Sequence, residues 1–273
     1  MSKMLGKKDP VNKPAIAFAD HLKIAPAHPL VDAAPTYKWP MDYNDQWGDC
    51  VVAGYDHFQE VVQKLLVGTY KNLTKAQILA LYKTQNPSFD PLSTTNGPGS
   101  AADGGMVIQE FLSYLVKKGK ILGFAKVDHT HKGQMQAAIY LGLGIITGAQ
   151  LTVAQQTQST WNYVPGDAPW GGHCTVSVGY TTGLEKVVSW GAVYPVTNSF
   201  VYYQIDEAWF VITQAHVDHP GFRAGFNLAS FAAAYKQITG RDFPVAVANE
   251  PGPSDHITLW DKIKDLFRRW MHL

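Results

Sequence analysis

Two residues of this chain, Cys50 and His173, have the types and surroundings of a nucleophile and its base. Cys50 ends the polar, turn-prone loop Asn44–Cys50 and comes directly before an apolar stretch. We therefore place it in the first turn of a helix, where unpaired backbone N–H groups and the positive end of the helix dipole lower the pKa of a thiol. Because the thiolate is the nucleophilic form, this position suits covalent catalysis.

The residues after Cys50 predict a long, largely buried helix. Apolar side chains recur there at helical spacing, while polar side chains occupy the other side of the same helix. The apolar positions are Val51, Val52, Tyr55, Phe58, Val62, Leu65 and Leu66, and the polar ones are Gln59, Glu60, Gln63 and Lys64.

The histidine is placed where it can be held rigidly. His173 follows two glycines and begins an alternating run that predicts a strand to Tyr180. A cysteine nucleophile also needs donors for the oxyanion that forms during attack. The side-chain amides of Asn44 and Gln46 are candidates, with the Cys50 backbone N–H as the second donor. We interpret Cys174 as a small packing residue that faces away from the site.

The remaining pattern predicts an α+β chain, helical in its first half and strand-rich in its second. Thr74 begins a capping box, the Pro- and Gly-rich stretch 86–105 is expected to be a long loop, and Gly119 ends a helix. The expected helices are 51–66, 74–85, 106–118, 134–141 and 228–235, and the expected strands are 121–127, 145–151, 173–180, 186–190, 200–205 and 209–213.

These motifs resemble those of papain-like cysteine peptidases. The loop Asn44–Cys50 is similar to the nucleophile segment of that superfamily, Gly171–Tyr180 to its histidine strand, and Ser189-Trp190-Gly191 to its Ser-Trp-Gly. The layout most resembles uncharacterised papain-like proteins of bacteriophages and bacteria. The resemblance implies a helical lobe and an antiparallel β lobe with a cleft between them. It also implies hydrolysis of an amide bond in a peptide, protein or peptidoglycan stem through a thioester.

Two positions depart from the family pattern. Asn44 stands where the family has a longer Gln, and Val188 stands where it has the Asn that orients the histidine. Ser189, Asn198 and Asp206 are the candidates to replace that Asn, although alternation along a strand turns Ser189 away if Val188 faces the site. The departures motivate an alternative hypothesis, a catalytically inactive papain-like fold used as a structural or adhesion protein, for example in a phage virion.

Composition limits the classes of function. The chain of 273 residues is 46% hydrophobic and 16% charged, which is typical of a globular protein, and its net charge of +1 gives no basic surface for nucleic acid. Two cysteines cannot build a disulfide framework, and we find no signal peptide, transmembrane segment, cofactor motif or metal-ligand spacing. The expected partner is a peptide or protein substrate, and the expected location is a host cytoplasm or a virion.

Three parts follow from the composition along the chain. Residues 1–40 form a Pro- and Lys-rich arm laid over the surface, with one helical turn near 18–22, and residues 41–247 form the papain-like domain. Residues 248–273 form a linker and an amphipathic helix. The apolar stripe of that helix is expected to dock on its own domain, on a protein partner or on a membrane surface. It consists of Ile257, Trp260, Ile263, Leu266, Phe267, Trp270 and Met271.

Deletion of residues 254–273 tests the role of this helix. We expect the shortened chain to keep its fold and to change its oligomeric state, because an exposed stripe with three large aromatic side chains needs a covering surface. Size-exclusion chromatography with light scattering and a thermal melt measure both properties. A much lower melting temperature, with the intact chain a lone monomer, would show that the helix belongs to the core.

Overall fold

A mainly antiparallel sheet forms one side of the molecule, and helices pack against it. The computed structural model describes residues 3–23, 30–34 and 38–245. In this part of the chain the seven-stranded sheet has the order β2-β7-β3-β4-β5-β6, with β1 paired to β4, and each of these pairs is antiparallel. The strands are β1 (Val31–Asp32), β2 (Gly123–Val127), β3 (Ile145–Thr152), β4 (Pro169–Tyr180), β5 (Leu184–Ser189), β6 (Ala192–Thr197) and β7 (Ile205–Ile212).

The helices lie mostly where their capping residues predict. Thr74 forms the expected capping box with Gln77, and Gly119 takes a left-handed φ of 64° just after α3. The helices are α1 (Cys50–Leu66), α2 (Lys75–Tyr82), α3 (Ile108–Lys117), α4 (Lys132–Gly142), α5 (Asn198–Gln204), α6 (Gln214–Asp218), α7 (Pro220–Gly225) and α8 (Leu228–Thr239), with 3-10 turns at Phe18–His21 and Val153–Gln156. The predicted α+β class is confirmed.

One predicted strand is wrong, and two strands were not predicted: the two-residue β1 in the N-terminal arm, and β6. Residues 200–205 read as a strand because they are rich in aromatic and β-branched residues, but they lie in α5 and at its end. The Thr197 side chain accepts the Phe200 N–H as an N-cap, and this local bond outweighs β propensity. Strand β6 pairs with β5 through a turn at Trp190 and Gly191, both with positive φ.

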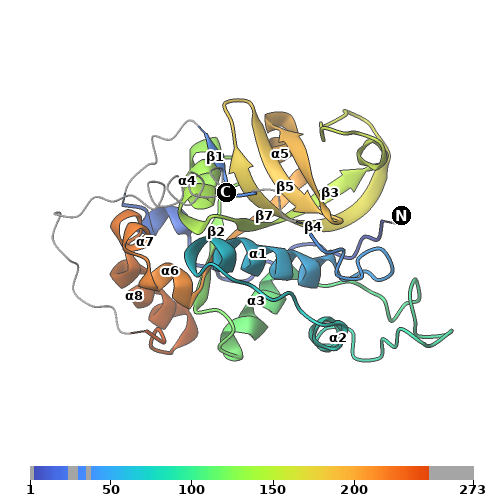
Figure 1. The fold of residues 1–273 in the computed structure, drawn as a ribbon, viewed down its shortest axis with the longest axis horizontal. Coiled ribbons are helices and arrows are strands. Elements are labelled where there is room, and N and C mark those ends of the chain that lie inside the picture. Colours follow the sequence, from blue (N-terminus) through green and yellow to red (C-terminus); the bar gives the residue numbers. More distant parts are fainter. Residues whose placement is uncertain (1–2, 24–29, 35–37, 246–273) are drawn as a thin grey trace.

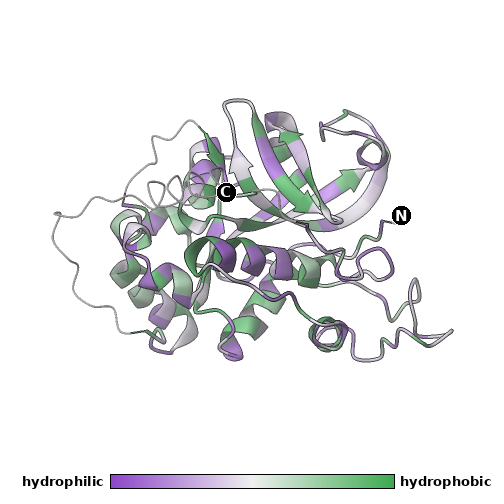
Figure 2. Ribbon diagram, viewed as in Figure 1, coloured by the Kyte–Doolittle hydropathy of each residue, from purple (hydrophilic) through white to green (hydrophobic). Residues whose placement is uncertain are grey.

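Helix α1 packs against β4 and runs beneath the sheet (Figure 1). Hydrophobic and hydrophilic residues alternate around it (Figure 2), yet every residue from Cys50 to Val62 is buried. The polar side chains Asp56 and Glu60 are satisfied by hydrogen bonds from the segment after α1, which includes Tyr70 and Asn72. Gln59 and Glu60, on the polar side of the predicted helix, are buried as well, because a neighbouring segment covers that side too.

The N-terminal segment does not lie only on the surface. The expected helical turn is present at Phe18–His21, and Phe18 is fully buried among aromatic side chains that include Phe210 and Phe226. Earlier in the chain, the dark-blue start of the ribbon passes between the sheet and the loop before α1 (Figure 1). Residues 4–8 therefore lie between the two halves of the molecule.

Two further sequence predictions concern the C-terminal helix and membrane-spanning segments. The amphipathic helix expected at 257–271 lies outside the described residues, as does its role in docking. Within the described part of the chain, no helix has the length and apolar character needed to cross a bilayer.

Gly54 sets how closely α1 approaches β4. A Cβ there would lie 2.9 Å from Cys174 Sγ. We expect Gly54→Ala to lower the free energy of unfolding by about 1–2 kcal/mol, because overpacking costs about 1–3 kcal/mol and exceeds the roughly 1 kcal/mol that alanine gains over glycine in a helix. Urea unfolding measures this change. Adding Cys174→Ala removes the clashing sulfur and should restore stability, whereas a neutral Gly54→Ala would contradict the close contact.

Candidate active site

Cys50 lies at the start of α1, directly against the histidine strand. Its side chain is buried, and its Sγ accepts the backbone N–H of Cys174 at 3.4 Å. Cys174 is the residue after His173, so this bond brings the first turn of α1 to the histidine. Gly6 of the N-terminal segment lies close to the sulfur as well, and its backbone N–H slightly lowers the pKa of the thiol. Cys174 itself packs against α1 at Gly54, as a packing residue would.

His173 is held between a hydroxyl and an indole ring. Its Nε2 lies 2.7 Å from Ser189 Oγ, and its ring stacks on Trp190 with centroids 4.0 Å apart. Both interactions fix the plane of the imidazole. The other ring nitrogen, Nδ1, is buried and has no hydrogen-bond partner among the described residues. Nε2 is therefore engaged in a hydrogen bond, whereas Nδ1 is available for proton transfer.

The register of the sheet explains why Ser189, not Val188, meets the histidine. Val188 pairs with Val176, and paired residues of an antiparallel sheet point to the same face. Val176 is three residues after His173, so Val176 and Val188 share the opposite face. Ser189 then lies on the face of His173. The condition under which the sequence turned Ser189 away, Val188 facing the site, does not hold.

The other two candidates to orient the histidine are engaged elsewhere. Asn198 begins α5, and Asp206 forms an ion pair with Lys7 at 2.7 Å. Trp190, whose ring stacks on His173, was not singled out from the sequence as a residue of the site. Its position in the Ser-Trp-Gly motif was the available signal.

Neither of the two side-chain amides proposed for the oxyanion forms a hydrogen bond with Cys50 among the described residues. Asn44 is buried, and its Nδ2 donates to the Trp47 carbonyl at 3.1 Å, which stabilises the loop. Gln46 is exposed on the surface of that loop. The described hydrogen bonds thus leave the Cys50 N–H, one of the unpaired groups that open a helix, as the remaining donor of the predicted set.

Residues 4–8, which we call the covering segment, lie across Cys50 and His173. The backbone N–H groups of Gly6 and Lys7 both donate to the Gly172 carbonyl, at 3.2 and 3.0 Å. On the other side, the Lys8 N–H donates to the Met106 carbonyl and the Met106 N–H donates to the Gly6 carbonyl. The covering segment is therefore held like an added strand between β4 and the residues that precede α3.

Small residues and an indole keep the covering segment close. A Cβ on Gly6 would overlap the Gly48 carbonyl, and one on Gly172 would overlap the Lys7 carbonyl. Trp190 Nε1 donates to the Met4 carbonyl at 3.1 Å, so the ring that stacks on His173 also holds the segment. These contacts explain why Cys50 and His173 are each only 1% exposed.

The burial keeps both groups neutral. Burial raises the pKa of Cys50 to about 12, against the smaller lowering effects of the Cys174 N–H, the Lys7 charge and the Gly6 N–H. Burial also lowers the pKa of His173 to about 3, and the nearby Lys3 charge acts in the same direction. The expectation of a depressed thiol pKa is therefore wrong for this covered state, because loss of water around the sulfur outweighs the helix dipole.

Two other histidines, His216 and His131, have structural contacts. His216 is buried, bonds the Gly142 carbonyl through Nε2 and Thr213 through Nδ1, and burial lowers its pKa to about 4. His131 accepts the Gln134 N–H and caps α4. Among the described residues, no group of three His, Cys, Asp or Glu side chains is placed to hold a metal ion.

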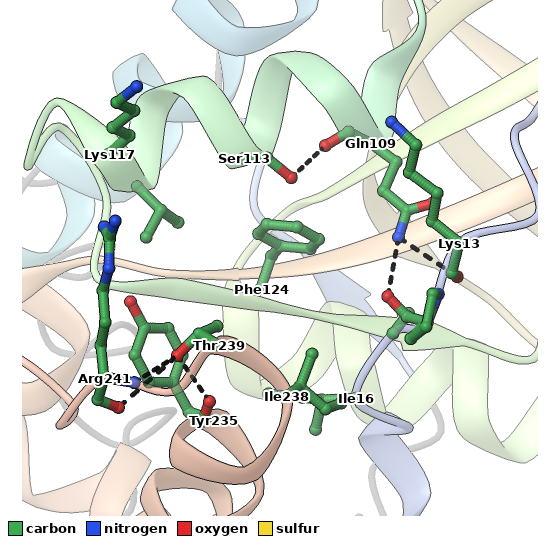
Figure 3. Close-up of a pocket in the computed structure, with 13 residues that line it drawn as sticks. Lys13, Ile16, Gln109, Ser113, Lys117, Phe124, Tyr235, Ile238, Thr239 and Arg241 are labelled. Carbon is green, nitrogen blue, oxygen red and sulfur yellow. Dashed lines mark hydrogen bonds between the residues drawn. The ribbon is translucent and has the colours of Figure 1, made fainter.

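A pocket of about 400 Å³ lies between the N-terminal segment, α3, β2 and the end of α8 (Figure 3). Phe124 forms part of its apolar wall. Two of its polar lining residues are already bonded: Gln109 donates to the Pro14 carbonyl, and Thr239 donates to the Tyr235 carbonyl. None of the lining residues belongs to the Cys50–His173 site, so we assign this pocket no part in the chemistry.

No protein-family model and no curated protein matches this sequence. Solved structures do match. Xylellain, a cysteine protease from Xylella fastidiosa, superposes with a TM-score of 0.51 at 13% identity, over 78% of this chain and 97% of that chain. The digestive procathepsin L 3 of the Tenebrio molitor larval midgut superposes with a TM-score of 0.52 at 11% identity, over 76% of this chain and 75% of that chain.

The chain has a papain-like fold. The fold class predicted from the sequence is therefore confirmed, with the helical part that begins at Cys50 and the antiparallel sheet that carries His173. At identities of 11–13%, the similarity shows the fold of papain-like cysteine proteases and leaves catalytic activity to experiment.

Burial of His173 gives the papain-like core a pH dependence. The folded pKa of about 3 lies below the ordinary 6.5, so between these values the unfolded chain holds a proton that the folded chain lacks. Stability from this group is therefore present above pH 6.5 and lost as the pH falls. Relative to His173→Gln, we expect the wild type to lose about 1.4 kcal/mol per pH unit between pH 6 and 4, measured by urea unfolding. A stability difference that does not change with pH would contradict this burial.

Proposed function

We propose that the protein is a cysteine peptidase that hydrolyses an amide bond of a peptide or protein, or of a peptidoglycan stem. The observation that carries the proposal is the junction at Cys174, where a cysteine in the first turn of a helix meets a strand whose histidine is oriented by Ser189. The papain-like fold supports the same chemistry, since it is the fold of known cysteine proteases.

In the proposed reaction, the Cys50 proton moves to His173 Nδ1 and the sulfur attacks the amide carbonyl carbon. The Cys50 backbone N–H stabilises the oxyanion. The C–N bond then breaks, His173 gives its proton to the leaving amine, and a thioester remains on Cys50. Water attacks the thioester with His173 as base, the C–S bond breaks, the carboxylic acid is released and the Cys50 thiol is regenerated. Ser189 keeps Nε2 tied, so that Nδ1 is the nitrogen that moves the proton.

The covering segment must leave before a substrate can bind. It occupies the Gly172 carbonyl and both backbone groups of Met106, which are the kind of groups that hold an extended peptide by main-chain hydrogen bonds. It also excludes water from the thiol and the imidazole. We infer that its departure restores solvent to the pair and brings the two pKa values toward each other, which allows the thiolate to form.

An inactive papain-like scaffold with a structural or adhesion role, for example in a virion, is the alternative hypothesis. Val188 and Asn44 motivated it, and the neutral covered pair is an observation in its favour. The two hypotheses differ in what happens when the covering segment is released: a peptidase gains an accessible thiol and peptide hydrolysis, whereas an inactive scaffold gains at most the accessible thiol.

Lys7→Ala tests the proposal by removing the buried anchor of the covering segment. Breaking a buried ion pair costs about 3–5 kcal/mol, so we expect the segment to open and iodoacetamide to label Cys50 at least about tenfold faster. The readout is mass spectrometry of both cysteines, with peptide hydrolysis measured in parallel and Cys50→Ala as the blank. Lys13→Ala is the matched control, because Lys13 pairs with Glu110 on the exposed surface. Fast opening without hydrolysis would favour the inactive scaffold.

A further inference from the structure

Beside the Cys50–His173 pair, the side chain of Lys7 enters a pocket with two carboxylates. Lys7 Nζ lies 2.7 Å from Asp206 Oδ2 and 3.6 Å from Glu207 Oε1. The side chain of Lys7 is fully buried, and that of Glu207 is 1% exposed. We call Asp206, Glu207 and Gly148 the acidic pocket.

The acidic pocket depends on an irregularity in β7. In the pairing of β3 with β7, Gly148 faces Glu207 and Ala149 faces Ile205, which leaves Asp206 as an extra residue. Successive side chains of a regular strand point to opposite faces, and a bulge re-aims one of them. The bulge explains how the adjacent Asp206 and Glu207 can both reach one ammonium group.

Gly148 makes the room for the long side chain. A Cβ at this position would overlap Cε of Lys7 and would lie 2.7 Å from Cγ of Glu207. The aliphatic part of Lys7 therefore passes over a backbone without a side chain. A side chain at position 148 would occupy the space that the end of the Lys7 side chain fills.

The carboxylates have acceptor capacity beyond what Lys7 uses. Gln150 Nε2 donates to Asp206 Oδ2, and Trp209 Nε1 donates to Glu207 Oε2 at 2.6 Å. The other oxygens, Asp206 Oδ1 and Glu207 Oε1, are buried and have no hydrogen bond from the described residues. A lysine presents three donors around one point, whereas a guanidinium presents five in a planar fork that matches carboxylates.

We propose that the acidic pocket is a specificity pocket, which accepts a lysine or, more tightly, an arginine side chain of an extended peptide once the covering segment has left. The inference rests on the proposed function for the claim that the bound peptide is cleaved. In the covered state, Lys7 occupies the pocket as an internal mimic of that side chain. The residue before it, Gly6, lies at the Cys50 sulfur, so the selected side chain belongs to the residue next to the one at the nucleophile.

Other classes of side chain fit the acidic pocket poorly. An apolar side chain would leave the buried Glu207 carboxylate without a cation, and an acidic one would add like charge at short range. Both penalties act through the same two carboxylates. Selectivity for a basic residue therefore follows from the charge that the fold buries here and does not depend on the exposed loops.

Peptide binding to the full chain carrying Cys50→Ala and Lys7→Ala tests the pocket without turnover. The probes are labelled peptides with the sequence of residues 4–9, with Lys, Arg, norleucine or Glu at the position of Lys7, followed by fluorescence anisotropy. We expect the Lys peptide to bind at least tenfold more tightly than the norleucine peptide, and the Arg peptide to bind more tightly still. Norleucine keeps the aliphatic chain and removes only the charge.

A second set of variants assigns the selectivity to the acidic pocket. Glu207→Gln should reduce the difference between the Lys and norleucine peptides by at least fivefold, while Glu110→Gln, outside the pocket, should leave it unchanged. If Glu207→Gln melts below the assay temperature, Asp206→Asn replaces it, because the Asp206 side chain is partly exposed. Equal affinity for the Lys, Arg and norleucine peptides, or no binding of the basic peptides to the folded chain, would overturn the inference.

Hydrolysis of the same peptides in quenched fluorescent form, by the Lys7→Ala chain with Cys50 intact, separates the two proposals. If the basic peptides bind selectively but are not cleaved, the result supports the specificity pocket and contradicts the peptidase proposal. Cleavage of all four peptides at similar rates would support the peptidase and overturn the pocket. Faster cleavage of the Arg and Lys peptides supports both.

Discussion

The hydrogen bond from the Cys174 backbone N–H to Cys50 Sγ joins the first turn of α1 to strand β4. Gly54, one helical turn further along, lets α1 approach the Cys174 side chain closely. The same approach places the start of the helix beside His173. The candidate site is thus a consequence of how one helix packs on one strand, and the rest of the sheet serves to fix the histidine.

Within the sheet, the position of His173 is set by neighbours on both sides. Register places Ser189 on its face of the sheet, and the turn at Trp190 and Gly191 folds the indole over the ring. A hydroxyl here takes the place of the amide that the papain-like pattern has one residue earlier. A different residue makes the contact, but Nε2 still has a polar partner, and an aromatic ring still covers the imidazole.

The covering segment affects Cys50 and His173 by excluding water from both groups. Two buried neutral groups, a thiol and an imidazole, are more stable without water than a thiolate and an imidazolium would be. The segment that excludes the water is held by backbone bonds to Gly172 and Met106 and by the buried charge of Lys7. In this covered state, residues 4–8 help to exclude the water that would stabilise a Cys50 thiolate.

The sequence determined the local elements and the two residues at the centre of the site. Helical spacing after Cys50, the capping box at Thr74 and the glycines before His173 are local signals, and α1, α2 and β4 form where they predict. The motif around Ser189 also came from the sequence, but its contact with His173 depends on strand register, which a single sequence does not reveal.

Only the tertiary structure decided the covering segment, the acidic pocket and the pKa of Cys50. Gly6 and Lys7 carry no periodic signal, and their partners Gly172 and Glu207 lie far along the chain. The bulge that aims Asp206 and Glu207 at one site is a property of two paired strands. The raised pKa of the thiol has the same origin, because a helix dipole can be inferred from nearby residues, whereas burial is decided by every segment that packs around the sulfur.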